Sequence, residues 1–266
     1  MMTKFERQMY DVVSDLRDTA GVLALKAEFE AEGTRVDELL RLLDVAKKAG
    51  LEIALKIGGC EAIRDLIESK SFGCQHIIAP MVETPYALSK FTDAVDRIYP
   101  GNQRQEVKCL FNIETKTAAQ NLEELLDIAE GKLDGAVFGR VDYVGSMGLS
   151  RDSVCSDQVL NTVMKVAKGC KQRGLELVVG GGVSGESIPF LRHVHEICLD
   201  RFETRKVIFS GSALSNAENL KKSLVKAVEF EILWLKNKRA FYQSIYMEDE
   251  QRIEMLEKRW GAFGDK

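Results

Sequence analysis

Apolar residues follow two alternating patterns along the chain. Short apolar runs such as residues 51–57 (LEIALKI) are typical of buried strands. Longer segments such as residues 35–49 place apolar residues at the three- and four-residue spacing of an amphipathic helix. The expected strands are 22–25, 51–57, 74–82, 108–113, 136–138 and 175–179, and the expected helices are 3–19, 35–49, 62–70, 85–98, 121–129 and 156–173.

This regular alternation predicts a parallel sheet, and the number of repeats predicts a closed (β/α)8 TIM barrel, a fold of about 250 residues. The whole chain, 1–266, is expected to form one domain with a barrel core over about 21–214, preceded by an N-terminal helix and followed by C-terminal helices over 216–263. Residues 196–202 and 206–210 both have strand character with only three residues between them, so the pattern does not decide which segment closes the barrel.

The C-terminal segment carries a narrow apolar stripe. Ile253, Leu256, Trp260 and Phe263 recur at three and four residues, and neither glycine nor proline interrupts residues 216–260. Such a stripe is consistent with packing on the chain's own barrel or on a neighbouring subunit.

Composition and charge narrow the class of protein. The formal net charge of −4 argues against nucleic acid as a partner, because binding the phosphate backbone requires a cationic face. No apolar run approaches the roughly 20 residues that span a bilayer, and the first residues are too charged for a secretory signal, so a cytoplasmic protein without a membrane partner is expected. The six cysteines form no CxxC pair, which indicates free thiols. His76 lies inside an expected strand and is interpreted as a core residue.

Two carboxylates follow neighbouring strands. Glu114 comes directly after the strand 108–113, and Asp142 follows the strand 136–138, with one expected helix between them. A right-handed crossover brings the carboxyl ends of two such strands to the same edge of the sheet. Oxygen ligands at this edge suit a Mg²⁺ or Mn²⁺ ion that keeps positions for water and substrate. The alternative is that each carboxylate caps a helix or pairs with a lysine.

An ordered set of motifs surrounds these carboxylates, namely 79–84 (APMVET), 113–115 (IET), 134–142 (DGAVFGRVD) and 147–148 (MG). Over about residues 22–214 the chain resembles the HpcH/HpaI aldolase and citrate lyase family of phosphoenolpyruvate- and pyruvate-binding barrels. The resemblance implies a Mg²⁺- or Mn²⁺-dependent carbon–carbon lyase of the class II aldolase type, acting on a 2-oxo acid such as pyruvate or oxaloacetate. It also implies a homo-oligomer formed through the C-terminal helix.

The resemblance assigns roles to particular residues. Glu114 and Asp142 match the metal ligands of the family. Gly139, Arg140 and Val141 match the segment whose backbone amides hold the substrate carboxylate.

Further polar side chains are expected at the carboxyl ends of the strands, where barrel enzymes place catalytic groups. The catalytic candidates are Lys26, Glu28, Lys56 and Asn112, and Glu83 is a candidate for substrate binding. Strand alternation puts Lys26 and Glu28 on one face, where they can form a salt bridge or transfer protons, and a lysine of lowered pKa could form a Schiff base.

The sequence departs from the family pattern at the expected catalytic positions. Lys56 stands where the family has an arginine, and it supplies charge without a bidentate fork. Residues 27–29 (AEF) stand where a Gly-Glu-His run is expected, and Asn112 replaces a glutamine. Proton transfer is therefore expected from Lys26, Glu28 or a water on the metal.

Two glycine-rich segments, 179–186 (VGGGVSGE) and 209–213 (FSGSA), follow the last expected strands. Turns that feed helices at this place resemble the phosphate site of barrel enzymes, where backbone amides face the anion. Close packing at the barrel rim explains the glycines equally well. The candidate phosphate-binding residues are Gly181, Gly182, Ser210, Gly211 and Ser212.

Three functions are compatible with the sequence. The first is the metal-dependent aldolase or lyase acting on the enolate of a 2-oxo acid. The second keeps the barrel but takes a phosphorylated or phosphoenolpyruvate-derived sugar acid. The third is a non-catalytic metabolite-binding barrel, which the missing histidine suggests and the intact metal-ligand pair opposes.

Overall fold

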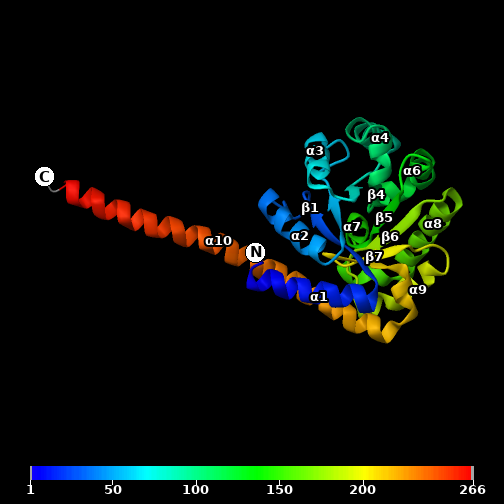
Figure 1. The fold of residues 1–266 in the computed structure, drawn as a ribbon. Helices are drawn as coiled ribbons and strands as arrows, with labels where there is room; N and C mark the ends of the chain where they lie inside the picture. The colour runs from blue at the N-terminus through cyan, green and yellow to red at the C-terminus, as the bar shows by residue number, and fades with distance from the viewer. Residues whose placement is uncertain (1, 265–266) are drawn as a thin grey trace.

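Eight strands close into a barrel in the order β1 to β8, and helices surround it (Figure 1). The computed structural model describes residues 2–264, and the side chains of residues 2–261. The strands are β1 (Val22–Glu28), β2 (Glu52–Lys56), β3 (His76–Ala79), β4 (Lys108–Ile113), β5 (Gly135–Gly139), β6 (Glu176–Gly180), β7 (Arg201–Glu203) and β8 (Val207–Ser210). The α-helices are α1 (Lys4–Ala20), α2 (Val36–Lys48), α3 (Ile63–Phe72), α4 (Pro85–Ile98), α5 (Lys116–Gln120), α6 (Leu122–Ala129), α7 (Arg140–Ser146), α8 (Asp157–Arg173), α9 (Ile188–His195) and α10 (Ala217–Gly264).

Strands β1 to β7 pair in parallel, and β8 is reversed. Only residues 204–206 join β7 to β8, and a link this short cannot carry the chain back along the barrel for a parallel pairing. β8 therefore runs antiparallel to both β7 and β1, with Phe209 opposite Phe202 on one side and Val22 on the other. The prediction of a (β/α)8 barrel is confirmed, with the qualification that its last strand runs in the opposite direction.

The two segments with strand character, 196–202 and 206–210, thus each contribute a strand, but the strand in 196–202 begins later than expected. Residues 196–200 do not form a strand. The backbone amides of Ile197 and Cys198 both donate to the carbonyl of Val194 at 3.0 Å, which closes the end of α9. The expected strand 196–202 was wrong over this part, and β7 begins at Arg201.

The remaining elements agree with the predicted order and differ in length. β3 covers four residues in place of the expected 74–82, because Pro80 has no amide hydrogen for the ladder and Met81 has a positive φ of 51°. The N-terminal helix starts from Thr3, whose side chain forms a capping box with Glu6. The expected helix 121–129 appears as α6, preceded by the short helix α5.

The centre of the barrel is an aliphatic layer to which every strand but β7 contributes one side chain. All of these side chains are buried, and none exceeds 3% exposure. This apolar layer separates the polar groups at the two ends of the barrel. Its members are Ala24, Ala54, Ile78, Leu110, Val137, Val178 and Ile208.

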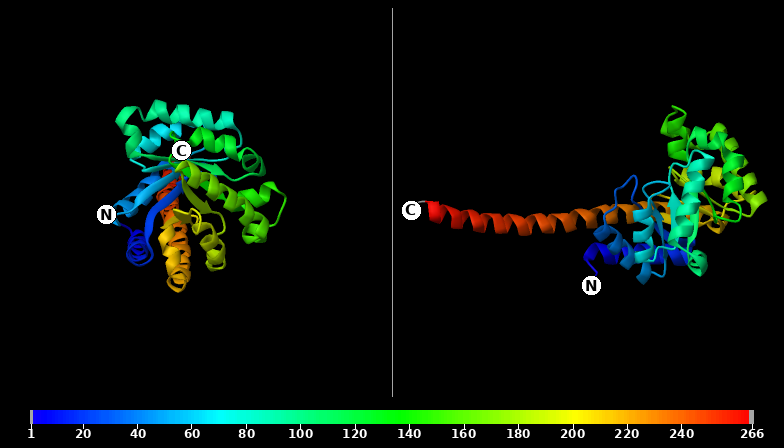
Figure 2. Two further views of the ribbon diagram at one scale, coloured as in Figure 1. Left: turned by 90° about the vertical axis from the view of Figure 1, so that its right-hand side faces the viewer. Right: turned by 90° about the horizontal axis from the view of Figure 1, so that it is seen from above.

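A single helix, α10, replaces the several helices expected over 216–263. Its first half lies antiparallel along α1, with Asn219 bonded to the carbonyl of Thr19 and Asn237 bonded to Thr3. Its second half extends away from the barrel, as Figure 2 shows most clearly in the view from above. No helix among residues 2–264 is both long and apolar enough to cross a membrane.

The expected apolar stripe at the C-terminus does not pack on the chain's own barrel. Ile253 and Leu256 are about half exposed, and Trp260 is 79% exposed. The side chain of Phe263, the fourth member of the stripe, lies outside the described residues. The stripe is therefore available to a partner.

Candidate active site

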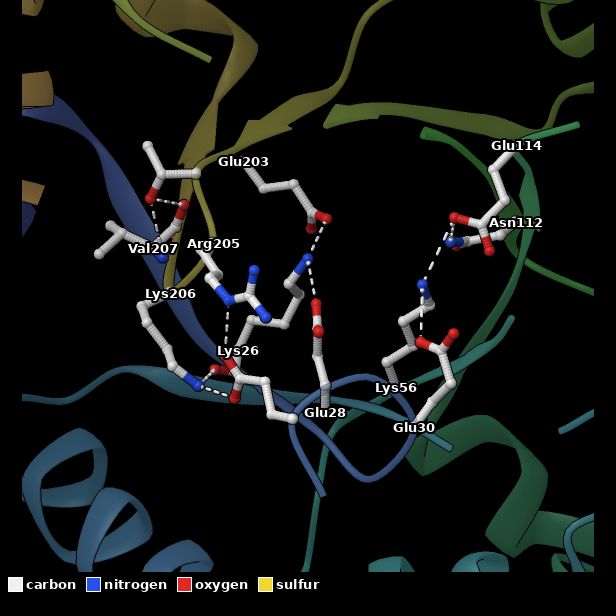
Figure 3. A network of polar contacts seen from close by, with 12 residues as sticks. Lys26, Glu28, Glu30, Lys56, Asn112, Glu114, Glu203, Arg205, Lys206 and Val207 are labelled. Atoms are coloured by element: carbon white, nitrogen blue, oxygen red, sulfur yellow. Dashed lines mark hydrogen bonds and ion pairs between the residues drawn. The ribbon is translucent and has the colours of Figure 1, made fainter. Parts of the chain in front are cut away.

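The barrel mouth at the carboxyl ends of the strands is lined by charged side chains that point inward (Figure 3). Lys26, Lys56 and Asn112 each come two residues after a member of the aliphatic layer, so strand alternation turns them to the interior. Lys26 and Lys56 are each 7% exposed, and Asn112 is 4% exposed. A buried ammonium group is stable only with a close carboxylate, which explains the acidic residues around them.

Lys26 lies between two carboxylates. Its Nζ atom is 2.5 Å from Glu203 Oε1 and 3.1 Å from Glu28 Oε1. Burial alone would lower the pKa of Lys26, but the two carboxylates outweigh it and raise that pKa well above its ordinary value. Burial would likewise raise the pKa of Glu28, but Lys26 outweighs it and the pKa of Glu28 is lowered. The lysine is therefore protonated and Glu28 is ionised, which does not favour Lys26 as a Schiff-base nucleophile.

Lys56 connects two further carboxylates. Its Nζ atom is 3.1 Å from Glu30 Oε2 and 3.4 Å from Glu114 Oε2. The pKa of Lys56 is raised, because the carboxylates outweigh the opposing effect of burial. The contact with Glu30 is the shorter one, so Lys56 keeps a partner if Glu114 binds something else.

Glu114 is held at the end of β4 by three neighbours besides Lys56. Asn112 Nδ2 donates to Glu114 Oε2 at 2.6 Å, and the backbone amide of Met81 donates to Glu114 Oε1 at 2.9 Å. On the other side Glu114 packs against Gly139, where an added Cβ atom would lie 2.7 Å from Glu114 Oε2. Only glycine fits at this position, and β5 can therefore bring its end directly beside the carboxylate.

Asp142 lies in the first turn of α7, three residues after Gly139. Its side chain is exposed, and among the described residues it forms no hydrogen bond or ion pair. The alternative roles considered for Asp142 were capping a helix and pairing with a lysine. The structure shows neither of them among the described residues. The predicted role of Glu114 and Asp142 as a metal pair remains a prediction.

The reversed strand β8 brings charged groups to the mouth that the sequence reasoning missed. Glu203 ends β7, and Arg205 and Lys206 follow in the turn that leads into β8. Arg205 Nε is 2.9 Å from Glu32 Oε1, and Lys206 forms an ion pair with the other oxygen of Glu32. The only signal for this turn was the three-residue link, which already requires an antiparallel pair.

The ion pairs at the mouth join five carboxylates, of Glu28, Glu30, Glu32, Glu114 and Glu203, to four cations, Lys26, Lys56, Arg205 and Lys206. The carboxylates therefore outnumber the cations by one, before the exposed Asp142 is counted.

Three buried oxygens at the mouth accept no hydrogen bond from any described residue, namely Asn112 Oδ1, Glu203 Oε2 and Glu30 Oε2, and the last of these has the ion pair with Lys56. Asn112 Oδ1 is adjacent to Glu114, and a buried acceptor of this kind is costly unless a ligand satisfies it. No group of three or more His, Cys, Asp or Glu side chains suited to a metal occurs among residues 2–264. Mg²⁺ characteristically takes one or two carboxylates and fills the other positions with water and substrate. Glu114 and Asn112 Oδ1 are oxygen donors of the kind such an ion takes, and Asp142, in the first turn of α7, is the predicted second carboxylate.

The predicted substrate-binding residues are only partly brought together. Arg140 is fully buried, and its guanidinium bonds the carbonyl of Gly180 at 3.1 Å and lies 4.9 Å from the ring centre of Phe190. Burial lowers the pKa of Arg140. This side chain packs between β6 and α9 and does not enter the mouth, so only the backbone amide of Arg140 could contact a substrate there. Its position after Gly139 sends it away from the interior.

The backbone amides of this segment remain suitable for a carboxylate. Gly181, with φ of +82°, approaches the amide nitrogens of Arg140 and Val141, and a Cβ atom there would lie within 2.8 Å of both. Glycine therefore keeps a side chain away from the two amides at this point. Glu83 is half-buried, and the structure shows its backbone carbonyl accepting from Asn121 at 2.8 Å.

The two glycine-rich segments lie at opposite ends of the barrel. Gly181 and Gly182 follow β6 at the carboxyl end. Because β8 is reversed, residues 210–212 follow it at the amino end, where the amide of Ser210 donates to the carbonyl of Gly21 at 2.9 Å. The phosphate site predicted from Gly181, Gly182, Ser210, Gly211 and Ser212 together is therefore wrong.

His76 is a core residue at the amino end, as expected from the sequence. Its Nε2 atom is 2.5 Å from Glu52 Oε2, and its Nδ1 atom is 3.0 Å from Arg201 Nη1. Burial and the nearby Arg201 lower the pKa of His76. The aliphatic layer lies between this histidine and the charged mouth.

A surface hollow of about 1070 Å³ lies between α9 and the start of α10 and includes no residue of the mouth. The mouth itself is filled by ion-paired side chains. The excess of carboxylates and the unsatisfied oxygens occur at the mouth, which is therefore the candidate site.

Comparison with known proteins agrees with this geometry. The model of the HpcH/HpaI aldolase/citrate lyase family matches residues 1–183. A sequence search of curated proteins finds no match.

Solved structures of low sequence identity share the fold. An HpcH/HpaI aldolase from Desulfitobacterium hafniense DCB-2 superposes with a TM-score of 0.59 at 15% identity, over 83% of this chain and 88% of that chain. An HpcH/HpaI aldolase/citrate lyase family protein from Burkholderia cenocepacia J2315 gives 0.61 at 14%, over 88% and 90%. A variant of the citrate synthase SbnG gives 0.52 at 15%, over 82% and 98%. The chain belongs to the HpcH/HpaI aldolase/citrate lyase family, and this membership supports a lyase-type function.

Proposed function

We propose that the protein is a divalent-metal-dependent lyase that makes or breaks a carbon–carbon bond next to the enolate carbon of a 2-oxo acid such as pyruvate or oxaloacetate. The observation that carries the proposal is the buried Glu114 at the barrel mouth, beside Gly139 and an unsatisfied oxygen of Asn112. Asp142, free of other described partners, supplies the second carboxylate.

Glu114 and Asp142 would hold a Mg²⁺ or Mn²⁺ ion, with Asn112 Oδ1 as a further oxygen donor. Such an ion acts as a Lewis acid toward the carbonyl and carboxylate of the substrate. Binding requires Glu114 to leave Lys56, whose contact with it is long, at 3.4 Å. Glu30 remains to hold the lysine.

The protein's own groups supply the rest of the site. The backbone amides of Arg140 and Val141 can bind the substrate carboxylate. Lys56, protonated and directed into the mouth, can stabilise the negative charge that develops on the enolate oxygen. Lysine does this with a single charged group and without the planar fork of an arginine.

Proton transfer falls to the groups around Lys26. Glu28 is ionised, so it can take the hydroxyl proton of an aldol substrate as the carbon–carbon bond breaks, and return that proton to the enolate carbon. Lys26 keeps Glu28 and Glu203 in place and lowers the pKa of Glu28. Glu28 and Lys26 would thus carry out the proton transfer for which this chain lacks the histidine of the family.

The test is release of pyruvate from 4-hydroxy-2-oxo acids, and from oxaloacetate, by the intact chain. Chelation should abolish turnover, and Mg²⁺ or Mn²⁺ should restore it. Glu114→Gln should reduce turnover at least about 100-fold, because it removes a ligand, while Asp152→Asn, which alters an exposed carboxylate in the 3-10 helix Arg151–Cys155, should not. Undiminished turnover in the chelated protein would overturn the metal-dependent mechanism.

A phosphorylated sugar acid as substrate is less well supported. The predicted phosphate site is split between the two ends of the barrel, so no pair of glycine-rich turns faces such a group. A non-catalytic barrel is also less well supported, because both predicted metal ligands, Glu114 and Asp142, are present. A protein that binds no divalent ion would favour the non-catalytic barrel instead.

We also infer that the chain self-associates through α10. The supporting observation is the exposed apolar stripe on the second half of this helix. Self-association does not depend on the chemistry proposed for the mouth.

A further inference from the structure

The exposed side of α10 carries one continuous row of residues spaced alternately by three and four. This is the a and d spacing of a coiled coil, and it extends well beyond the four residues of the C-terminal stripe. The row is apolar or aromatic at all but two positions. Its described members are Val225, Val228, Ile232, Leu235, Arg239, Tyr242, Tyr246, Asp249, Ile253, Leu256 and Trp260.

The row has no intramolecular partner over most of its length. Val225 is 70% exposed and Tyr246 is 61% exposed, on the side of α10 opposite to buried residues such as Phe230 and Trp234. Tyr242 is the exception, because its hydroxyl bonds Glu38 Oε1 at 2.8 Å. Among the described residues no hydrogen bond or ion pair joins residues 243–264 to the barrel.

The projecting segment needs a partner for physical reasons. Residues 243–264 would extend about 33 Å at 1.5 Å per residue. A lone helix of this length is marginal in water and gains most of its stability from packing an apolar face. The segment exposes Tyr246, Ile253, Leu256 and Trp260, so a solvated single helix would leave large apolar side chains uncovered.

The two polar positions of the row specify which partner fits. If a second α10 lies antiparallel and the pair is centred on Ser244, Arg239 meets the partner's Asp249, and Asp249 meets the partner's Arg239. The same register pairs Tyr242 with the partner's Tyr246. It also pairs the apolar residues 235 with 253, 232 with 256, and 228 with 260, always an a position with a d position, as antiparallel coiled coils require.

A parallel pair in register gives the opposite result. It would place Arg239 against the partner's Arg239, and Asp249 against the partner's Asp249. Like charges in the core of an interface cost several kcal/mol. The self-complementary charges therefore select the antiparallel arrangement, and both arrangements have the two-fold symmetry of most homodimers.

We propose that two copies of this chain form an antiparallel coiled coil through α10, in the register that joins Arg239 to the partner's Asp249 twice. The inference specifies the self-association proposed above and does not depend on the lyase activity. The charged residues beside the row form both favourable and unfavourable pairs in this register. Lys236 faces the partner's Glu250 and Glu231 faces the partner's Arg259, whereas Glu229 faces the partner's Glu257.

Lys238, which faces the partner's Arg252, is already paired with Glu38 at 3.0 Å.

The arrangement also brings the partner close to the barrel mouth. Leu235 of the row lines a hollow of about 340 Å³ together with Glu32, Arg205 and Lys206. In the proposed register residue 253 of the partner packs on Leu235. The partner helix therefore covers the edge of this hollow, beside the turn between β7 and β8.

Charge exchange on the full chain tests the register, with mass measured by light scattering across a dilution series. Arg239→Asp, or Asp249→Arg alone, should raise the dissociation constant of the dimer at least about 100-fold, because two like-charged pairs replace two opposite pairs. The double variant Arg239→Asp/Asp249→Arg should restore the wild-type value. Lys258→Asp, the same charge change outside the row, should leave the dimer intact. Circular dichroism of each variant separates dissociation from unfolding.

A wild-type chain that is monomeric would overturn the proposal, and so would a dimer that Arg239→Asp leaves unchanged or that the double variant fails to restore. A folded monomer with normal turnover would reject the coiled coil and leave the lyase in place. A wild-type dimer without turnover would reject the lyase alone.

Discussion

Glu203 accepts a hydrogen bond from Lys26 at 2.5 Å, although 177 residues separate them in the sequence. The pair joins β1 to β7 across the reversed strand β8, and both side chains are buried. The same ion pair therefore helps to close the barrel and forms part of its charged mouth.

Removing one member of this pair should destabilise the fold. Glu203→Gln leaves Lys26 with Glu28 alone, so the free energy of unfolding should fall by about 3 kcal/mol, the lower end of the range for a broken buried ion pair. Denaturant unfolding measures the change. Glu106→Gln, which alters an exposed carboxylate, is the matched control, and equal stability of the two variants would contradict the role of Glu203.

Lys56 and a metal ion should compete for Glu114. Lys56→Met removes a positive charge 3.4 Å from the carboxylate, so Mn²⁺ should bind at least about tenfold more tightly. Turnover should nevertheless fall about 100-fold or more, because the group proposed to stabilise the enolate is gone. Lys56→Arg keeps the charge and should retain much of the turnover. Unchanged Mn²⁺ affinity in Lys56→Met would show that the lysine does not restrain Glu114.

The buried His76 should make stability depend on mildly acidic pH. Its pKa is lowered in the folded protein by burial and by Arg201, so the unfolded chain binds the proton more readily. Stability is therefore complete above the unfolded pKa of about 6.5 and falls as the pH drops below it, by roughly 1–2 kcal/mol between pH 7 and 5. Denaturant midpoints across this range should show a shallower slope in His76→Gln. The exposed His193→Gln is the control, and a slope unaffected by His76→Gln would refute the assignment.

Much of the barrel could be predicted because its strands and helices differ in period. Strand alternation correctly turned Lys26, Lys56 and Asn112 into the interior, since each follows an aliphatic-layer residue by two positions. The motif after β4 likewise identified the buried Glu114. These inferences needed only local geometry and the parallel order of β1 to β5.

What could not be predicted depends on contacts distant in sequence. Glu203, Arg205 and Lys206 reach the mouth because a three-residue turn reverses β8, and the same reversal moves Ser210 to the other end. The short link was a usable signal for this reversal. The direction of the Arg140 side chain toward Phe190 also lay beyond the sequence pattern, which gave no indication that the chain turns into α7 at this residue.

Titration of the chelator-treated protein with Mn²⁺, by calorimetry, tests the central claim most directly. We predict one Mn²⁺ bound per chain, with affinity reduced at least about 100-fold in Glu114→Gln and in Asp142→Asn, and unchanged in Asp152→Asn. A wild-type chain that binds no divalent ion, or that binds it equally well without Glu114 and Asp142, would contradict the metal site at the barrel mouth.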